Sequence, residues 1–110
     1  MGGAMGRFVI AAFKPKPAMQ QQLLAVVEKH WRVLQEQGLV TERPRYAMQA
    51  ADGTVVEVFE WLSPDAIEKA HHNPAVLALW AEFEAVCEYV PVSGLAEAQH
   101  PFSEFQPLPL

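Results

Sequence analysis

The chain has 110 residues, of which 51% are hydrophobic and 19% are charged, and its formal net charge is -5. This length fits a single domain, and the composition is that of a globular protein rather than a disordered one. The acidic balance and the scattering of the eight lysines and arginines argue against binding to nucleic acid, which needs a concentrated basic surface.

Cysteine use and hydropathy bear on the cellular compartment. The single cysteine, Cys87, has no partner for an internal disulfide, which suits a reducing environment. The apolar run Phe8–Phe13 is too short for a signal-peptide core or a membrane span. We therefore expect a cytoplasmic protein with no membrane partner. The opening segment Met1–Gly6 has no pattern and is assigned no role.

The first half of the chain predicts a buried strand, a helix and an edge strand. Residues Arg7–Lys14 are apolar on both alternating faces, as in a strand that is buried on both sides. From Ala18 the apolar residues recur at helical spacing, and Gly38 closes this helix. A second strand is expected at Val40–Ala51, at an edge of the sheet because Pro44 cannot donate a hydrogen bond to a neighbouring strand.

The pair Asp52-Gly53 predicts a tight turn into a third strand, Thr54–Leu62. A two-residue turn places Arg45 opposite Glu60, and we expect an ion pair between them. An active-site role for the carboxylate is the alternative. Glu57 and Glu60 are three residues apart and point to opposite faces, so one of them faces the helices or a pocket and must be paired there.

The second half predicts an interrupted helix and a last strand. Ser63-Pro64-Asp65 is a well-capped helix start, and Asn73-Pro74 repeats that pattern, so the helix should break near His72. It should then restart over Pro74–Tyr89. Residues Ser93–Gln99 are the expected fourth strand.

This order of elements predicts an α+β domain over residues 7–100. Short connections favour the ferredoxin-like βαββαβ arrangement, with a four-stranded antiparallel sheet and the helices on one face. The first and third strands form the expected central pair, and their second apolar face would remain uncovered. We therefore expect a homodimer formed through this sheet face. The proline-rich tail, residues 101–110, carries apolar rings and is expected to lie extended against the domain.

Several residues resemble those of a known superfamily. The run Glu57–Ser63, followed by Ala66-Ile67-Glu68, His71, Pro74 and Trp80, resembles the dimeric α/β-barrel superfamily and, within it, the antibiotic-biosynthesis-monooxygenase-like proteins. The resemblance covers most of the chain and implies two such domains pairing into a dimeric α/β barrel. It also implies a small cofactor-free monooxygenase that acts on a planar aromatic or polyketide-like substrate. A shared fold does not by itself transfer a reaction.

Trp61 and His71 form the main candidate site. A histidine titrates near neutral pH and could take a proton from a phenol or quinol, and a tryptophan supplies a flat wall for an aromatic ring. The spacing is similar to that of haem-degrading members of the superfamily, where the histidine binds the haem. Those members also have an asparagine on the first strand, which Arg7–Lys14 lacks, so no cofactor is expected. The alternative is that both residues serve packing.

Other side chains could contact a substrate near this pair: Tyr46, Trp80, Phe83 and Glu60. A metal site is not expected, because Glu68 and His72 share a helix face without a third ligand. His30 and His100 stand alone in the sequence and are assigned no role. Cys87 is expected to be a buried apolar residue rather than a nucleophile.

Two functions therefore stay open. One is a cofactor-free monooxygenase-like enzyme. The other is a non-catalytic homodimer that binds a small ligand or supports a larger assembly. A pocket beside Trp61 and His71 that is large enough for a ring would favour an enzyme or a ligand binder, whereas large side chains filling that space would argue against catalysis there.

Overall fold

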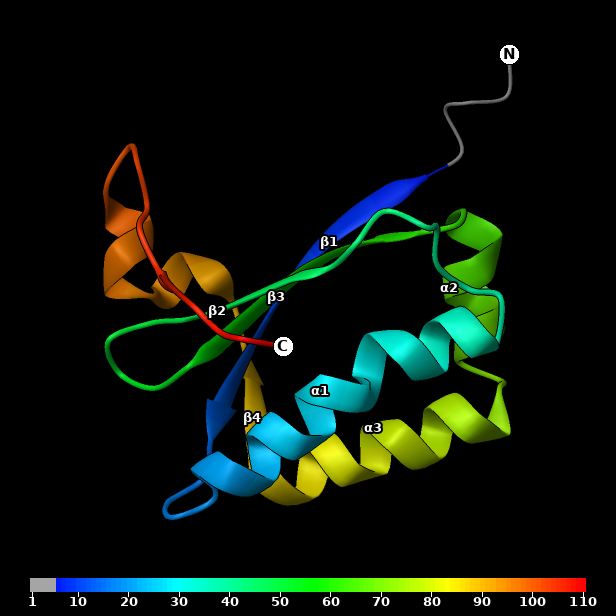
Figure 1. Ribbon diagram of the computed structural model, residues 1–110, viewed down its shortest axis with the longest axis horizontal. Coiled ribbons are helices and arrows are strands. Elements are labelled where there is room, and N and C mark those ends of the chain that lie inside the picture. The colour runs from blue at the N-terminus through cyan, green and yellow to red at the C-terminus, as the bar shows by residue number, and fades with distance from the viewer. Residues whose placement is uncertain (1–5) are drawn as a thin grey trace.

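The computed structural model describes residues 6–110, so the segment Met1–Gly6 lies outside it except for its last residue. The elements in chain order are β1 (Arg7–Pro15), α1 (Gln20–Glu36), β2 (Tyr46–Gln49), β3 (Val55–Trp61), α2 (Pro64–Ala70), α3 (Pro74–Val86), β4 (Cys87–Val90), the short 3₁₀ helices η2 (Val92–Gly94) and η3 (Ala96–Gln99), and β5 (Gln106–Pro107). Figure 1 shows α1 and α3 on one side of the sheet and the C-terminal turns on the other.

The sheet is antiparallel and has the strand order β4-β1-β3-β2-β5. The expected α+β class is confirmed, and β1 and β3 form the central pair as predicted. The sheet has five strands rather than the expected four, because part of the C-terminal tail adds β5 beside β2.

Local signals fix the ends of the helices. Gly38 has a φ of 72° just after α1, a conformation that glycine adopts without strain. The Ser63 side chain accepts a hydrogen bond from the N–H of Ala66 at the start of α2. The Asn73 side chain caps α3 in the same way, so the predicted break near His72 is found between the two helices. None of the helices in residues 6–110 is long and apolar enough to cross a bilayer.

The hairpin between β2 and β3 corrects the predicted register. The loop contains the three residues 51–53 rather than two, since the Ala50 N–H donates to the Thr54 carbonyl at 2.8 Å. Gly53, with a φ of 93°, provides the left-handed residue that such a three-residue loop requires. The one-residue shift moves Arg45 to the helix-facing side of the hairpin, because neighbouring residues of a strand point to opposite faces. The expected Arg45–Glu60 pair is therefore absent.

The last strand also differs from expectation. Helix α3 ends at Val86, and β4 follows at once and pairs with the free edge of β1. Cys87, with φ -151° and ψ 171°, already has the extended backbone of a strand. The segment expected as the fourth strand, Ser93–Gln99, instead forms most of η2 and η3, and the buried side chain of Leu95 packs on the sheet between them.

These turns divide the outer face of the sheet, the face opposite α1 and α3, into two halves. One half is covered, because Leu95 and Phe105 pack over Ala12 and Val56. The other half stays open, and its most exposed large side chains are those of Phe8 at 64%, Ile10 at 55% and Tyr46 at 65%. The uncovered apolar face expected from the sequence is thus half of the sheet rather than all of it.

The tail lies extended against the domain and also pairs with it. Met48 is opposite Pro107 in the short ladder between β2 and β5, and the Leu108 N–H donates to the Ala47 carbonyl at 3.0 Å. Leu108 packs against the main core, whereas Phe105 packs against the outer face. Phe102, in the loop before β5, is 87% exposed.

The two phenylalanines of the tail form a matched pair for testing its role. We expect Phe105→Ala to lower the free energy of unfolding by roughly 2 kcal/mol and the melting temperature by several degrees, because a packed ring is removed. Phe102→Ala should leave both unchanged. Thermal and urea unfolding measure the difference, and equal melting curves for the wild type and Phe105→Ala would show that the tail does not stabilise the fold.

Candidate functional site

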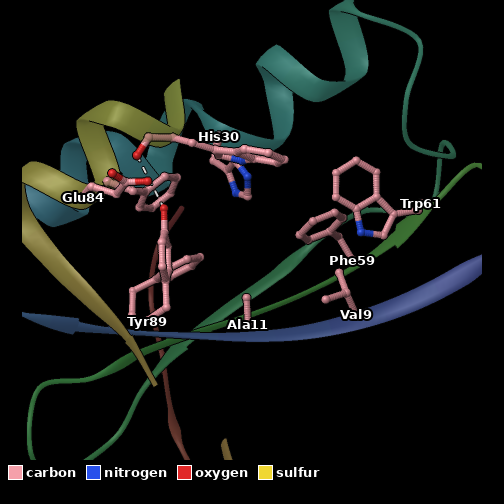
Figure 2. Close-up of a pocket in the computed structure, with 10 residues that line it drawn as sticks. Val9, Ala11, His30, Phe59, Trp61, Glu84 and Tyr89 are labelled. Atoms are coloured by element: carbon pink, nitrogen blue, oxygen red, sulfur yellow. Dashed lines mark hydrogen bonds between the residues drawn. The ribbon is translucent and has the colours of Figure 1, made fainter. Parts of the chain in front are cut away.

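A cleft of about 270 Å³ lies between the helix-facing side of the sheet and the helices α1 and α3. Its size is just below the roughly 300–1,000 Å³ usual for small-molecule sites. The residues that line it are mostly apolar and aromatic: Val9, Ala11, Phe13, His30, Phe59, Trp61, Trp80, Phe83, Glu84 and Tyr89. In Figure 2, His30 extends from α1 above the sheet, Phe59 and Trp61 lie toward one end of the cleft, and Glu84 and Tyr89 lie toward the other.

His30 is placed in the cleft by the buried stripe of α1. It follows Val27 by three residues and precedes Leu34 by four, and all three side chains are buried against the sheet. The imidazole meets the rings of Phe13, Phe59 and Phe83 edge to face, at interplanar angles of 88°, 89° and 81°. These contacts hold the imidazole ring in one orientation.

A buried carboxylate holds one nitrogen of this ring. Nδ1 of His30 lies 2.6 Å from Oε1 of Glu57, whose side chain is wholly buried on β3. The other carboxylate oxygen, Oε2, accepts a hydrogen bond from Nη1 of Arg45 at 2.6 Å. Arg45 also donates to the carbonyls of Val27 and Glu28 on α1. Arg45, Glu57 and His30 thus form a continuous chain, the buried triad, from the loop before β2 through β3 to α1.

The second nitrogen of His30 is available to the cleft. No side chain or carbonyl within residues 6–110 is bonded to Nε2, since the hydrogen bond of this ring is the one made by Nδ1. The fully buried side-chain atoms without a partner in that part of the chain are Nε1 of Trp31 and Oγ1 of Thr54. His30 lines the cleft and is 4% exposed, so its unbonded Nε2 is the atom of this ring with which a molecule in the cleft could form a hydrogen bond.

Two other titratable side chains near the cleft are poor bases. Burial, with smaller contributions from Cys87 and Glu84, raises the pKa of Tyr89 to about 12, so its hydroxyl stays neutral at physiological pH. That hydroxyl donates to the Trp80 carbonyl at 3.4 Å. Burial likewise raises the pKa of Cys87 to about 11, and its thiol donates to the Phe83 carbonyl. Neither group is suited to accept a proton or to attack a substrate at neutral pH.

The structure brings together some of the predicted site residues and separates others. Trp61, Trp80 and Phe83 line the cleft. His71 is exposed and does not line it; its ring contacts the Trp80 ring at a centroid distance of 5.2 Å, and its Nδ1 is 2.9 Å from the Ile67 carbonyl.

Tyr46 and Glu60 lie on the outer face, away from the cleft. Tyr46 is 65% exposed. Glu60 accepts a hydrogen bond from Thr41 at 2.9 Å and forms an ion pair with Arg43, whose Nε lies 2.8 Å away, so its carboxylate is already paired on that face. The one-residue shift of the hairpin explains this arrangement. It brings Arg45 to the face of the sheet where Glu57 lies, and Glu60 pairs instead with Arg43 in the loop before β2.

Sequence reasoning missed His30, although a signal for it existed. The residue lies on the apolar stripe of α1, where a polar side chain must find a buried partner. Glu57 occupies the matching position in an apolar strand. Two buried polar side chains that each require a partner indicate a His30–Glu57 pair. Because the two residues are 27 positions apart, no local sequence motif reveals this pair.

Metal ligands are not clustered in the described chain. Residues 6–110 contain no group of three or more histidine, cysteine, aspartate or glutamate side chains that could hold a metal ion. Nε2 of His72, in the turn after α2, lies 3.1 Å from Oε2 of Glu68, but both side chains are exposed.

Comparison with known proteins gives a relation of fold. No protein-family model matches the chain, and no curated protein matches it. Among solved structures it is similar to SnoaB, described as a cofactor-independent oxygenase from Streptomyces nogalater, with 16% sequence identity and a TM-score of 0.68 over 79% of this chain and 88% of that chain. The predicted resemblance to antibiotic-biosynthesis-monooxygenase-like proteins is thereby confirmed at the level of the fold.

Two arginines provide a matched test of the buried triad. Replacing Arg45 by Met should lower the free energy of unfolding by about 3–5 kcal/mol, because it leaves the buried Glu57 carboxylate without its cation. The same change to Met at Arg43, whose side chain is 68% exposed beside Glu60, should lower the free energy of unfolding by only roughly 0–1 kcal/mol. Urea unfolding measures both changes. Similar losses for the two variants would contradict a structural role for the triad.

Proposed function

We propose that this protein is a cofactor-independent oxygenase that acts on a small planar aromatic molecule with an ionisable hydroxyl group. The observation that carries the proposal is the unbonded Nε2 of His30, a residue that lines a cleft walled by aromatic side chains. The rings of Phe59 and Trp61 offer apolar contact to a flat substrate, and the imidazole offers a proton acceptor to its hydroxyl. The fold shared with a cofactor-independent oxygenase supports the same reaction class.

The proposed reaction begins with proton transfer. The substrate hydroxyl gives its proton to Nε2 of His30, and the resulting anion passes one electron to molecular oxygen. The substrate radical and superoxide then combine, and the new peroxide anion takes the proton back from His30. Loss of water from the carbon that bears the hydroperoxide leaves a carbonyl. One oxygen atom enters the substrate and the other leaves as water, so a phenol and O₂ yield a quinone and H₂O.

The apolar walls and the buried carboxylate of the cleft both support these reaction steps. The apolar walls exclude water from the anion, which strengthens its interaction with the protonated imidazole. The Glu57 carboxylate beside Nδ1 stabilises that imidazolium while the substrate reacts. In this proposal His30 takes the role that the sequence suggested for His71, while Trp61 keeps its role as a wall.

Two histidines separate this proposal from its alternatives. We expect His30→Gln to lower turnover by roughly a hundredfold or more while the protein stays folded, because glutamine keeps a hydrogen bond to Glu57 but cannot take up the proton. His71→Gln, outside the cleft, should keep wild-type turnover. Oxygen uptake with hydroxylated one- to three-ring aromatics is the measurement, beside thermal melting of each variant.

The outcomes of this experiment differ clearly. Wild-type turnover in His30→Gln, or loss of turnover in His71→Gln, would contradict the assignment of the base. Aromatics that bind without any oxygen uptake would favour the second function left open by the sequence, a ligand-binding protein without catalysis.

We also propose that the working form is a homodimer joined through the open half of the outer face. Phe8, Ile10 and Tyr46 are exposed together there, and Val58 lies among them in the sheet. Contiguous apolar surface of this kind is unusual on a monomer. A two-fold contact between two copies would cover both patches at once.

Two exposed apolar residues test the dimer. Ile10→Glu places a charge on the open half of the outer face and should give monomers or unfolded chains. Leu77→Glu places the same charge on an exposed position of α3 and should leave the dimer intact. Light scattering should show twice the 12.3-kDa chain mass for the wild type. A stable folded wild-type monomer at micromolar concentration would contradict the proposal.

A further inference from the structure

We infer that Glu57 and Arg45 are positioning residues that keep Nε2 of His30 unprotonated, so that this nitrogen can only accept a hydrogen bond from a ligand in the cleft. The cleft then selects aromatic ligands that donate a hydrogen bond and rejects the carbonyl form of the same skeleton. The inference rests on the proposed cleft as the binding site, but it makes no use of turnover. It assigns the ligand class, an aromatic alcohol or quinol, and names the residues that determine it.

The first step concerns the carboxyl group of Glu57. A guanidinium donates hydrogen bonds and accepts none, so Oε2 must accept from Nη1 of Arg45, 2.6 Å away. Arg45 is itself buried, with a side chain 8% exposed, and its charge has no other counter-ion among its described contacts, which are the Val27 and Glu28 carbonyls. A protonated Glu57 would leave that cation uncompensated, which is costly in a buried site. Glu57 is therefore a carboxylate, which only accepts.

The second step concerns the imidazole. Since Oε1 of Glu57 only accepts, the hydrogen between it and Nδ1 of His30 must belong to Nδ1. In the neutral ring the other nitrogen, Nε2, then carries a lone pair and no hydrogen. A doubly protonated ring would put two cations on one carboxylate, inside a box formed by Phe13, Phe59 and Phe83. The ring without ligand is therefore the neutral Nδ1–H tautomer.

The third step concerns the ligand. A hydroxyl group that reaches Nε2 donates a hydrogen bond to the nitrogen lone pair. A carbonyl oxygen at the same place has no hydrogen to donate, so two lone pairs would face each other. The carbonyl ligand loses the hydrogen bond and leaves a buried polar atom unpaired, which corresponds to roughly a tenfold to hundredfold weaker affinity. This selection also suits the proposed reaction, because the quinone formed from a phenol no longer binds His30 and is released.

One substitution should reverse the polarity. In Glu57→Gln the amide oxygen can accept from Arg45, and the amide nitrogen must then donate to Nδ1 of His30. With Nδ1 as acceptor, the neutral ring carries its hydrogen on Nε2 and becomes a donor toward the cleft. The variant should therefore lose its preference for a hydroxyl ligand and gain affinity for the carbonyl form. A role of Glu57 in packing alone would change stability without this change of preference.

The test uses the full chain and a matched pair of probes, 1,4-dihydroxynaphthalene and 1,4-naphthoquinone, which share one skeleton and differ by two hydrogens. Calorimetric titration under anaerobic conditions measures binding while no oxygenation can occur. Nitrogen-15 NMR of the histidine side chains reads the tautomer of His30 directly. His30→Phe serves as the variant without the acceptor, and His71→Phe as its control outside the cleft.

We expect the Nδ1–H tautomer in the wild type and a dissociation constant at least about tenfold lower for the quinol than for the quinone. His30→Phe should abolish this ratio, His71→Phe should keep it, and Glu57→Gln should bring it to one or below. An Nε2–H tautomer or an imidazolium in the wild type at neutral pH would overturn the inference, as would equal affinities or failure of both probes to bind.

The tautomer and the wild-type ratio decide the matter even where Glu57→Gln does not fold. Loss of turnover in His30→Gln together with no discrimination between the probes would sink this inference and leave the proposed function standing. Discrimination between the two probes without any oxygen uptake would contradict the proposed function and leave this inference standing.

Discussion

The fully buried carboxylate of Glu57 ties together elements from three parts of the chain. A charge without solvent must be paired, and Glu57 has Arg45 on one oxygen and His30 on the other, each at 2.6 Å. These contacts join β3, α1 and the loop before β2 at one point, and Arg45 adds two carbonyls of α1 to the same junction. The hairpin register, the rotation of α1 and the orientation of the imidazole must therefore agree, since a shift in any of them would leave a buried charge unpaired.

The two faces of the sheet have separate tasks. On the inner face, β1 and β3 present aromatic and apolar side chains to α1 and α3, and the cleft lies there beside His30. On the outer face, the C-terminal turns and tail cover one half, and the open half carries Phe8, Ile10 and Tyr46. The proposed binding site and the proposed dimer surface thus occupy opposite sides of the same central strands, so a change in one need not disturb the other.

Much of the fold could be predicted from the sequence, because local patterns determine it: the two-sided apolar strands, the caps at Ser63 and Asn73, and the glycine after α1. The predictions from sequence were wrong where a one-residue difference in loop length determines a contact between distant residues. Whether the turn at Asp52-Gly53 has two or three residues changes the partner of Arg45, and the sequence favours neither length strongly. The candidate site was harder to predict, because Trp61 could be found from a resemblance, whereas His30 is paired with Glu57, which lies 27 residues away in another element.

In the proposed site, an aromatic hydroxyl binds in the cleft against Nε2 of His30. The most direct measurement is a crystal structure of the protein grown or soaked without oxygen in 1,4-dihydroxynaphthalene. We expect the ring between the walls that include Phe59 and Trp61, with a hydroxyl oxygen at hydrogen-bond distance from Nε2, about 2.6–3.2 Å. A ligand bound instead beside His71 or on the outer face near Tyr46, with the cleft empty, would contradict this binding mode.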